Sequence, residues 1–117
     1  MAFLRHWVNG NAVSLYELEK AITLGRSKQC HIQLDDATVS SEHAEIRPQA
    51  KGYTLVDLGS TNGVRLNGEK VAEAALRQGD RFLLGTHEFE YLLQLPSELG
   101  KTQKIRKSWI PGVYYTE

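Results

Sequence analysis

The sequence predicts an all-β fold. Short apolar segments follow one another along the chain, and several of them alternate apolar and polar residues with a period of two. Turn-forming Gly, Asn, Asp and Pro residues separate these segments, and almost no stretch has the period of an amphipathic helix. At 117 residues the chain has the length of about one domain. About ten short strands at this spacing favour a β-sandwich or a β-barrel.

The N-terminal half contains five of the expected strands. Its first two segments flank Asn9-Gly10-Asn11, a composition that predicts a hairpin turn. A polar segment beginning at Gly25-Arg26 interrupts the alternation, and a second one from Asp35 to Ser41 precedes the fifth strand. Pro48 is expected to end that strand, because proline has no N–H to donate to a β-ladder. The five strands are expected over residues 3–8, 12–18, 21–24, 31–34 and 42–47.

The C-terminal half begins with strands expected over residues 53–58 and 64–66. Asn67-Gly68 follows, and Asn-Gly favours the positive φ angles of a tight turn between strands. The segment from Glu69 to Leu76 contains three alanines and is the one segment expected to be helical, although it is too short to be stable without tertiary contacts. The clearest period of two in the chain predicts the last strand and comes from Phe89, Tyr91, Leu93 and Leu95.

The alternating pattern stops at Pro96. We therefore expect one β-sandwich domain over residues 1–95 and a C-terminal tail over residues 96–117. The tail contains several large apolar residues, including Trp109 and Tyr114, which a fully disordered segment rarely carries. It is therefore expected to be partly ordered and partly disordered.

The composition argues against several functional classes. Hydrophobic residues make up 41% of the chain and charged residues 24%, as in soluble globular proteins. No apolar run is long enough to span a bilayer, and Arg5 and His6 lie where a signal peptide needs apolar residues. We therefore expect a cytoplasmic protein without a membrane partner. Lys and Arg together number 14, as do Asp and Glu, so no net positive charge attracts nucleic acid.

No metal or other cofactor is expected. Cys30 is the only cysteine, so it has no partner for an internal disulfide. Cys30, His31, Asp35 and His43 carry groups that bind metals, but their spacing matches no tight ligand pattern. A buried or unreactive thiol is the simpler interpretation of Cys30.

Three connections between the expected strands are candidates for a binding site. One carries Arg26, one carries Ser40, and one runs from Asp57 to Gly68 with three glycines and two Asn-Gly pairs. One strand separates Arg26 from Ser40, and simple alternation would place them at opposite ends of a sandwich, so the residues alone do not decide whether they converge. If they converge, the guanidinium and the hydroxyls of Ser40 and Thr61 suit a phosphate dianion, and the amide of Asn62 suits an extended peptide backbone.

Other interpretations of these residues stay open at this point. Arg26 would form a surface ion pair with Asp35-Asp36, Ser40 would cap a turn, and Asn62-Gly63 would be a hairpin turn and nothing more. Ser40 and His43 are a hydroxyl and a base, but a hydrolase also needs an orienting acid and an oxyanion hole, and no Gly-x-Ser-x-Gly elbow surrounds this serine. We therefore expect no enzyme.

Six short motifs occur in order between Ile22 and Leu93. They are Gly25-Arg26, Ile32-x-Leu34-Asp35, Val39-Ser40-x-x-His43-Ala44, Asp57-Leu58-Gly59-Ser60-Thr61-Asn62-Gly63, Leu66-Asn67-Gly68, and Leu76-x-x-Gly79-Asp80 with Gly85. Each motif is common by itself, whereas all six at this spacing make a chance match improbable. Together they resemble the forkhead-associated (FHA) domain.

The resemblance implies an eleven-stranded, FHA/SMAD-like β-sandwich of two mostly antiparallel sheets, whose loops at one end bind phosphothreonine peptides. Such a module catalyses nothing and recruits a phosphorylated protein, such as a Ser/Thr kinase substrate, into a signalling or assembly complex. The alternative is a scaffold or oligomerisation module of the same fold, which assembles through a sheet face or its C-terminal tail and leaves the phosphate site unused.

The resemblance also implies a role for individual residues. Arg26 and Ser40 resemble the principal phosphate ligands of the family, Thr61 the hydroxyl that completes the phosphate site, and Asn62 the residue that binds the peptide main chain. Ser41 stands where the family usually has arginine, which removes one positive charge near the site. Residues that resemble the structural support of the site are Gly25, His43 and Gly63.

The tail contains two further candidates. The basic run Lys104 to Lys107 has too few charges for more than weak binding to nucleic acid or a membrane surface. Thr102 has Ile105 three residues later, and FHA domains commonly read an aliphatic residue at that distance from the phosphothreonine. We hypothesise that phosphorylated Thr102 is a ligand for the site of its own or a neighbouring molecule. The alternative is an unmodified, solvated threonine.

Overall fold

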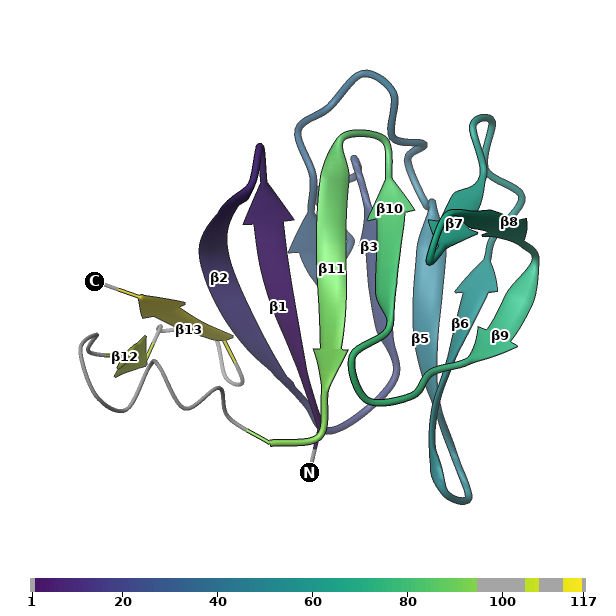
Figure 1. Ribbon diagram of the computed structural model, residues 1–117. Helices are drawn as coiled ribbons and strands as arrows, with labels where there is room; N and C mark the ends of the chain where they lie inside the picture. The colour runs from purple at the N-terminus through teal and green to yellow at the C-terminus, as the bar shows by residue number, and fades with distance from the viewer. Residues whose placement is uncertain (1, 95–104, 108–112, 117) are drawn as a thin grey trace.

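A computed structural model describes residues 2–94, 105–107 and 113–116 of the chain. All regular secondary structure among these residues is β-strand, which confirms the all-β prediction (Figure 1). The strands are β1 (Ala2–Val8), β2 (Asn11–Leu18), β3 (Ile22–Gly25), β4 (Ile32–Gln33), β5 (Ala44–Gln49), β6 (Gly52–Asp57), β7 (Val64–Leu66), β8 (Glu69–Val71), β9 (Glu73–Ala75), β10 (Arg81–Leu84), β11 (His87–Leu92), β12 (Ile105–Lys107) and β13 (Val113–Thr116).

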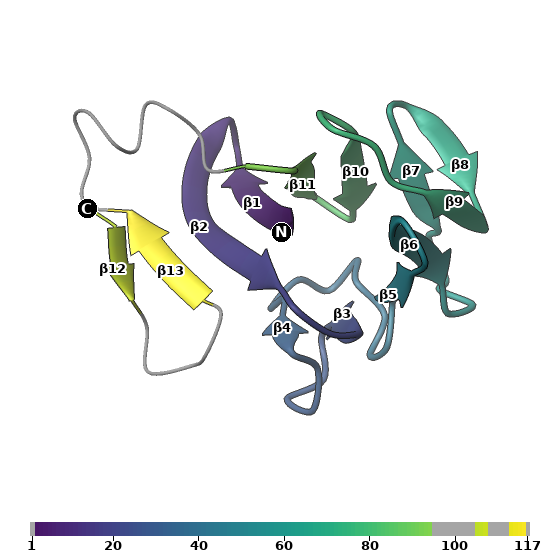
Figure 2. The ribbon, with the colours of Figure 1, turned by 90° about the horizontal axis from the view of Figure 1, so that it is seen from below.

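The strands form two sheets that lie face to face, as Figure 2 shows. The larger sheet has the order β12-β13-β2-β1-β11-β10-β7-β8, and the smaller has the order β4-β3-β5-β6-β9. The eleven strands β1 to β11 contribute six strands to one sheet and five to the other, as expected for the sandwich. Among the described strands, every neighbouring pair is antiparallel except β3 and β4.

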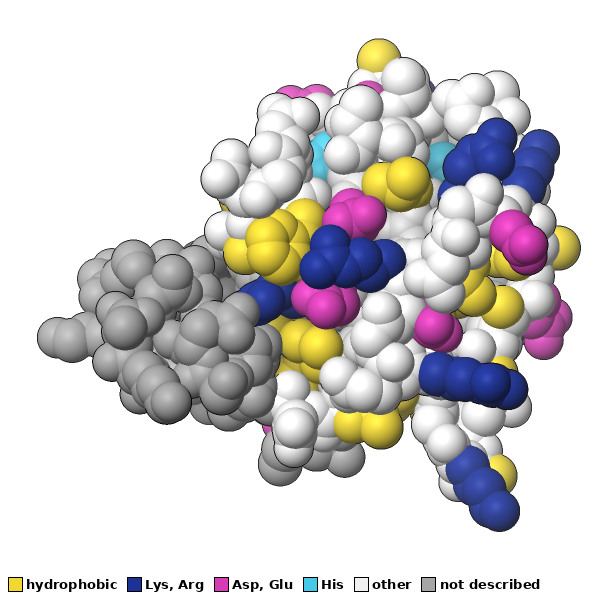
Figure 3. All heavy atoms as spheres, viewed as in Figure 1, with side chains coloured by type: hydrophobic (Ala, Val, Ile, Leu, Met, Phe, Trp, Pro, Cys, Tyr) yellow, Lys and Arg dark blue, Asp and Glu magenta, His cyan; other side chains and the backbone are white. Residues whose placement is uncertain are grey.

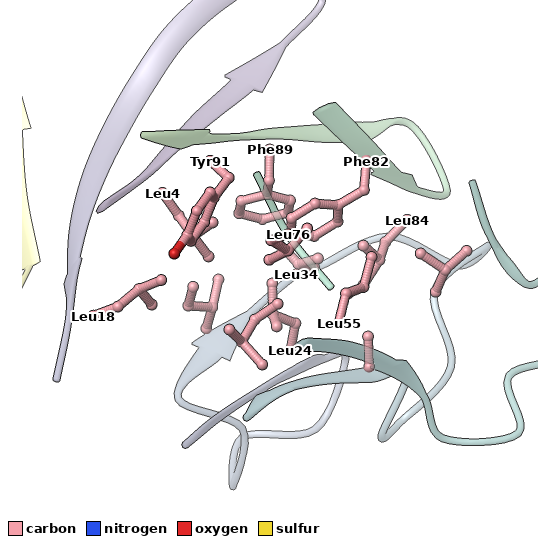
Figure 4. Close-up of a cluster of buried hydrophobic side chains, with 14 of the residues drawn as sticks. Leu4, Leu18, Leu24, Leu34, Leu55, Leu76, Phe82, Leu84, Phe89 and Tyr91 are labelled. Carbon is pink, nitrogen blue, oxygen red and sulfur yellow. The ribbon is translucent and has the colours of Figure 1, made fainter. Parts of the chain in front are cut away.

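The hydrophobic core fills the space between the sheets (Figure 4). Alternation along each strand sends every second side chain inward, so Phe89 and Tyr91 of β11 are both buried. The rings of Phe82 and Phe89 stack with centroids 5.4 Å apart. The smaller sheet and its loops contribute aliphatic side chains to the same core, among them Leu24, Leu34, Ile46 and Leu55.

Two Asn-Gly pairs form the tight hairpin turns that the sequence predicts. Asn9 and Gly10 have φ angles of 50° and 79°, and Asn67 and Gly68 have φ angles of 49° and 89°. Positive φ at both central residues matches the right-handed twist of the flanking strands. Asn62-Gly63 differs, because only its glycine has a positive φ, of 80°. This pair is therefore no simple two-residue hairpin turn.

The prediction of a helix from Glu69 to Leu76 is wrong. This segment forms β8, which pairs with β7, and β9, which pairs with β6. The tight turn at Asn67-Gly68 starts the first of these pairings, and Leu55 lies opposite Ala74 in the second. Pairing with two existing strands outweighs the weak helical preference of a few alanines, because an isolated helix of this length is unstable.

Two expected strand ends are also wrong. Pro48 lies within β5, beyond the last residue that pairs with β3, so its missing N–H interrupts no hydrogen bond on that side. β11 ends at Leu92, and the backbone N–H of Leu93 donates to the Gln78 side chain at 2.6 Å instead of continuing the ladder. Leu93 is consequently exposed, and Leu95 lies outside the described residues.

Strand β13 pairs with β2 and, with β12, extends the larger sheet at that edge. Val113 lies opposite Tyr16, and Tyr114 lies opposite Leu15. Part of the expected tail is therefore β-strand. The domain boundary at Leu95 lies outside the described residues and stays a prediction, as does the partial disorder of the tail.

Candidate functional site

The parallel pairing of β3 and β4 brings the Arg26 and Ser40 loops together. Leu24 and Gly25 lie opposite Ile32 and Gln33, so both strands end at the same end of the sandwich. The backbone N–H of Arg26 donates to the carbonyl of Ser40 at 3.0 Å. Simple alternation fails here because the connection over residues 26–31 returns to the start of β3 before β4 begins. The two loops therefore converge.

The third loop meets Ser40 from the other side. The backbone N–H of Thr61 donates to Ser40 Oγ at 3.0 Å, and Asn62 Nδ2 donates to the carbonyl of Thr38 at 2.8 Å. Residues 38–40 thus lie between the loop of Arg26 and the loop of Thr61 and Asn62. Figure 1 shows the connection from β4 to β5 arching over this end of the sandwich, beside the β10–β11 turn.

His43 fixes the positions of two of these loops from within. Its side chain is fully buried, its Nδ1 accepts the backbone N–H of Ser40 at 3.0 Å, and its Nε2 lies 2.8 Å from the carbonyl of Gly63. Because Nδ1 accepts a backbone N–H, the proton of the neutral ring is on Nε2, which donates to that carbonyl. One imidazole therefore ties Ser40 to the turn that follows Asn62.

Two glycines allow the loops to approach closely. A Cβ on Gly25 would come within 2.3 Å of the carbonyl oxygen of Ser41, which no side chain tolerates. A Cβ on Gly63 would come within 2.5 Å of Lys70 Cε, and the φ of +80° at Gly63 is strained for other residues. The structure thus gives Gly25, His43 and Gly63 a physical reason to occupy their positions.

The turn that carries Thr61 and Asn62 is rigid because its own side chains bond its backbone. Asp57 Oδ1 accepts the N–H of Ser60 at 2.9 Å, and Ser60 Oγ accepts the N–H of Gly63 at 2.9 Å. Such local bonds replace the ladder that a strand would provide. The turn therefore presents Thr61 and Asn62 in one arrangement.

The polar groups at this end of the sandwich are available to a ligand. Arg26, Thr61 and Asn62 are exposed, and Ser40 is half-buried. Among the residues that the structure describes, the Arg26 guanidinium has neither an ion pair nor a hydrogen bond. A planar cation, two hydroxyls and an amide on three converging loops have the chemistry to bind an oxyanion that is attached to a peptide.

Asp36 is a structural residue of this end that the sequence interpretation missed. Its carboxylate accepts the N–H and the hydroxyl of Thr38, at 2.8 and 2.7 Å, and the hydroxyl of Thr86 at 2.7 Å. These hydrogen bonds hold the pKa of the Asp36 carboxyl well below its usual range. Asp36 therefore ties the β10–β11 turn to the loop of Ser40. The Asp-x-Thr spacing was the available signal.

Two histidines continue this network into the larger sheet. His87 lies 3.7 Å from the Asp36 carboxylate, and its Nδ1 is 2.8 Å from His6 Nε2. The His6 ring stacks on Phe89 with centroids 4.5 Å apart. Burial, together with the nearby His87, lowers the pKa of His6 from 6.5 to about 4. His6 is therefore neutral in the folded protein at pH 7.

The part of the chain that the structure describes has one cysteine and no helix. No three His, Cys, Asp or Glu side chains gather there in a metal-binding arrangement. No helix in that part is long and apolar enough to cross a membrane. Cys30 is a free, buried thiol that donates to the Ser41 carbonyl at 3.2 Å.

The family model of the FHA domain matches residues 22–85, which contain all three loops. The chain belongs to the FHA domain family. The resemblance that the six motifs predicted is thereby confirmed.

Curated relatives of this FHA chain include two bacterial regulators. The glycogen accumulation regulator GarA of Mycobacterium tuberculosis strain H37Rv is 42% identical over 83 residues, which are 70% of this chain and 51% of GarA. The oxoglutarate dehydrogenase inhibitor of Corynebacterium jeikeium is 39% identical over 83 residues, which are 70% of this chain and 58% of the inhibitor. The chain spans about half the length of the curated relatives it matches.

Solved FHA structures superimpose on most of the chain. One, from a study of phosphothreonine-dependent FHA domain interactions, has a TM-score of 0.70 and 31% identity and covers 81% of this chain and 98% of its own. EmbR of Mycobacterium tuberculosis in complex with a low-affinity phosphopeptide has a TM-score of 0.73 and 32% identity, over 81% of this chain and 25% of EmbR. These matches confirm the FHA sandwich.

Proposed function

We propose that this FHA domain binds phosphothreonine-containing protein segments through the three loops at one end of its sandwich and catalyses no reaction. The observation that carries the proposal is the convergence of Arg26, Ser40 and Thr61 through two hydrogen bonds, Arg26 N–H to Ser40 O and Thr61 N–H to Ser40 Oγ. These bonds bring the three loops together, and among the described residues the Arg26 guanidinium has no ion pair or hydrogen bond of its own.

Each residue has a distinct role in this proposal. Arg26 forms charge-assisted hydrogen bonds to the phosphate, and the hydroxyls of Ser40 and Thr61 donate to its other oxygens. Asn62 has its side chain at the loop surface and binds the peptide main chain. Threonine is preferred over serine because its methyl group buries apolar surface worth about 0.8 kcal/mol and restricts χ1.

The proposed partner is a protein phosphorylated by a Ser/Thr kinase, and the proposed location is the cytoplasm. The free thiol of Cys30 is compatible with a reducing compartment. FHA relatives named as regulators or inhibitors support a role in regulatory assembly. The hypothesis that Thr102 and Ile105 form a self-ligand stays a prediction, because Thr102 lies outside the described residues.

Titration of the full chain with a degenerate phosphothreonine peptide library tests the proposal. Calorimetry with phosphothreonine, phosphoserine and unphosphorylated versions should show binding of the first, weaker binding of the second and none of the third. Arg26→Ala and Ser40→Ala should each reduce the affinity at least tenfold. Arg47→Ala is the matched control, because Arg47 is an exposed arginine of β5 that pairs with Glu45. Binding that survives both site variants would favour the scaffold alternative.

A further inference from the structure

The β7–β8 hairpin places a lysine against the turn that presents Asn62. Lys70 lies on β8, and its side chain reaches back over Gly63, the residue after Asn62. A Cβ on Gly63 would come within 2.5 Å of Lys70 Cε and 3.4 Å of Nζ. The ammonium group of this exposed lysine therefore lies beside the peptide-binding corner of the proposed site.

A second cation stands next to Lys70. Arg65 of β7 lies directly opposite Lys70 in the register of the hairpin, so both side chains project from the same face. Both are exposed, and Figure 3 shows Lys and Arg side chains gathered where β7 and β8 lie in Figure 1. Like charges directly opposite each other destabilise a two-stranded pair. The Arg65–Lys70 pair is nevertheless the central one of the three pairs that join β7 to β8.

No acidic residue compensates this pair within the described part of the chain. Neither Arg65 nor Lys70 forms an ion pair there, whereas the exposed Arg81 of the neighbouring β10 pairs with Glu88 at 2.9 Å. Glu69, the residue before Lys70, lies opposite Leu66 and so projects from the other face of the hairpin. Two adjacent uncompensated cations are therefore available to an external anion.

The loops that carry Arg26 and Ser40 have no net positive charge of their own. Between residues 26 and 43, the two loops that carry Arg26 and Ser40 contain two cations, Arg26 and Lys28, and three carboxylates. Their formal charge is therefore −1, and Ser41 stands where the family usually supplies an arginine. A dianionic phosphate flanked by acidic residues would meet net repulsion from these loops. With Asp57 of the third loop the three loops sum to −2, and Lys70 and Arg65 bring the formal charge of the whole end to 0.

We propose that Lys70 and Arg65 form a subsite for an acidic side chain of the bound segment, so that this domain selects phosphothreonine with Asp or Glu on the side of the peptide that crosses the β7–β8 hairpin. The inference rests on the proposed function. Both groups are solvent-exposed, so each contact contributes a modest factor that falls with salt. The two together should give a preference of about fivefold for an acidic over a neutral flank.

The test compares two phosphothreonine peptides on the full chain. One carries Glu at the positions flanking phosphothreonine, and the other carries Gln at the same positions. By calorimetry at 0.1 M salt, the wild-type protein should bind the Glu peptide about fivefold more tightly, and the preference should shrink at 0.5 M salt. Lys70→Gln and Arg65→Gln together should remove the preference and leave the affinity for the Gln peptide within about twofold.

Three controls keep the outcomes separate. Lys51→Gln changes an exposed lysine of the β5–β6 turn and should keep the preference, as should Lys70→Arg. Circular dichroism melting verifies that the variants are folded. Equal binding of both peptides by the wild type, a preference that survives the double variant, or an equal loss for both peptides would overturn the subsite alone. No binding of either phosphopeptide would overturn the proposed function itself, and the subsite with it.

Discussion

Thr61 donates its backbone N–H to the hydroxyl of Ser40 at 3.0 Å, across 21 positions of sequence. This bond joins two loops that approach from opposite sides, and the same hydroxyl is the one proposed to bind phosphate. Ser40 therefore has a structural role and a binding role at once. A variant of Ser40 should affect both properties, in different amounts.

Ser40→Ala should reduce phosphopeptide affinity at least tenfold and destabilise the fold by only about 1 kcal/mol. The stability loss is small because the backbone N–H of the exposed Thr61 can donate to water instead. Ser40→Thr keeps the hydroxyl and should retain much of the affinity. Calorimetry and urea unfolding measure the two quantities. An affinity loss matched by a stability loss of several kcal/mol would show that Ser40 acts only through folding.

Gly25→Ala should destabilise the protein by about 2 kcal/mol or more, because its Cβ would overlap the Ser41 carbonyl. The φ of Gly25 is ordinary, so the effect isolates the close approach of the two loops. Gly59→Ala is the control: Gly59 has a φ of +78° and open space around its Cβ position, so it should cost about 1 kcal/mol. Urea unfolding compares them, and equal losses would disprove the clash.

Stability should fall as the pH is lowered from about 6.5 to about 4. The folded state keeps the pKa of His6 at about 4, whereas the unfolded chain protonates this histidine near 6.5. Between these values the unfolded state binds more protons, so acid favours unfolding, by about 3 kcal/mol at most. His6→Phe should preserve the stacking on Phe89 and remove this part of the pH dependence. Urea titrations at pH 7, 5.5 and 4.5 measure it; an unchanged slope would contradict the assignment.

The chain phosphorylated at Thr102 should bind external phosphopeptides more weakly if the tail is a self-ligand. The apparent affinity for a reference phosphopeptide would then fall several-fold relative to the unphosphorylated chain, because the site is already occupied. Thr102→Ala, treated with the same kinase, is the control. Sedimentation distinguishes binding within one molecule from binding between two. Unchanged affinity after stoichiometric phosphorylation would exclude the self-ligand.

Local patterns in the sequence predicted most of the strands and the turns at Asn9-Gly10 and Asn67-Gly68. These patterns failed where pairing with a strand far away in the sequence determines the secondary structure. The alanine-rich segment from Glu69 to Leu76 became two strands because β7 and β6 offered partners. A strand was expected over residues 31–34, where β4 lies, but its alternation could not show that β4 pairs with β3 in parallel.

The candidate site shows the same limit. The motifs around Arg26, Ser40 and Asn62 were recognisable as a family pattern, but the residues alone could not show that the loops converge. Lys70 had no signal at all, because its contact with Gly63 crosses a hairpin and depends on the register of β7 and β8. Asp36 was visible only as an acid near Thr38. Such contacts come from geometry that composition and spacing do not encode.

The brevity of β4 has a consequence for how the site responds to a ligand. Two ladder pairs at the edge of a sheet are easily opened, so the β4 end of the Arg26 loop should exchange its amide hydrogens faster than the loop that the buried His43 holds at Ser40. The Ser40 loop is then the more rigid side of the site, and the Arg26 loop is the more adjustable side. Ligand affinity would partly reflect the entropy lost when the adjustable side is immobilised.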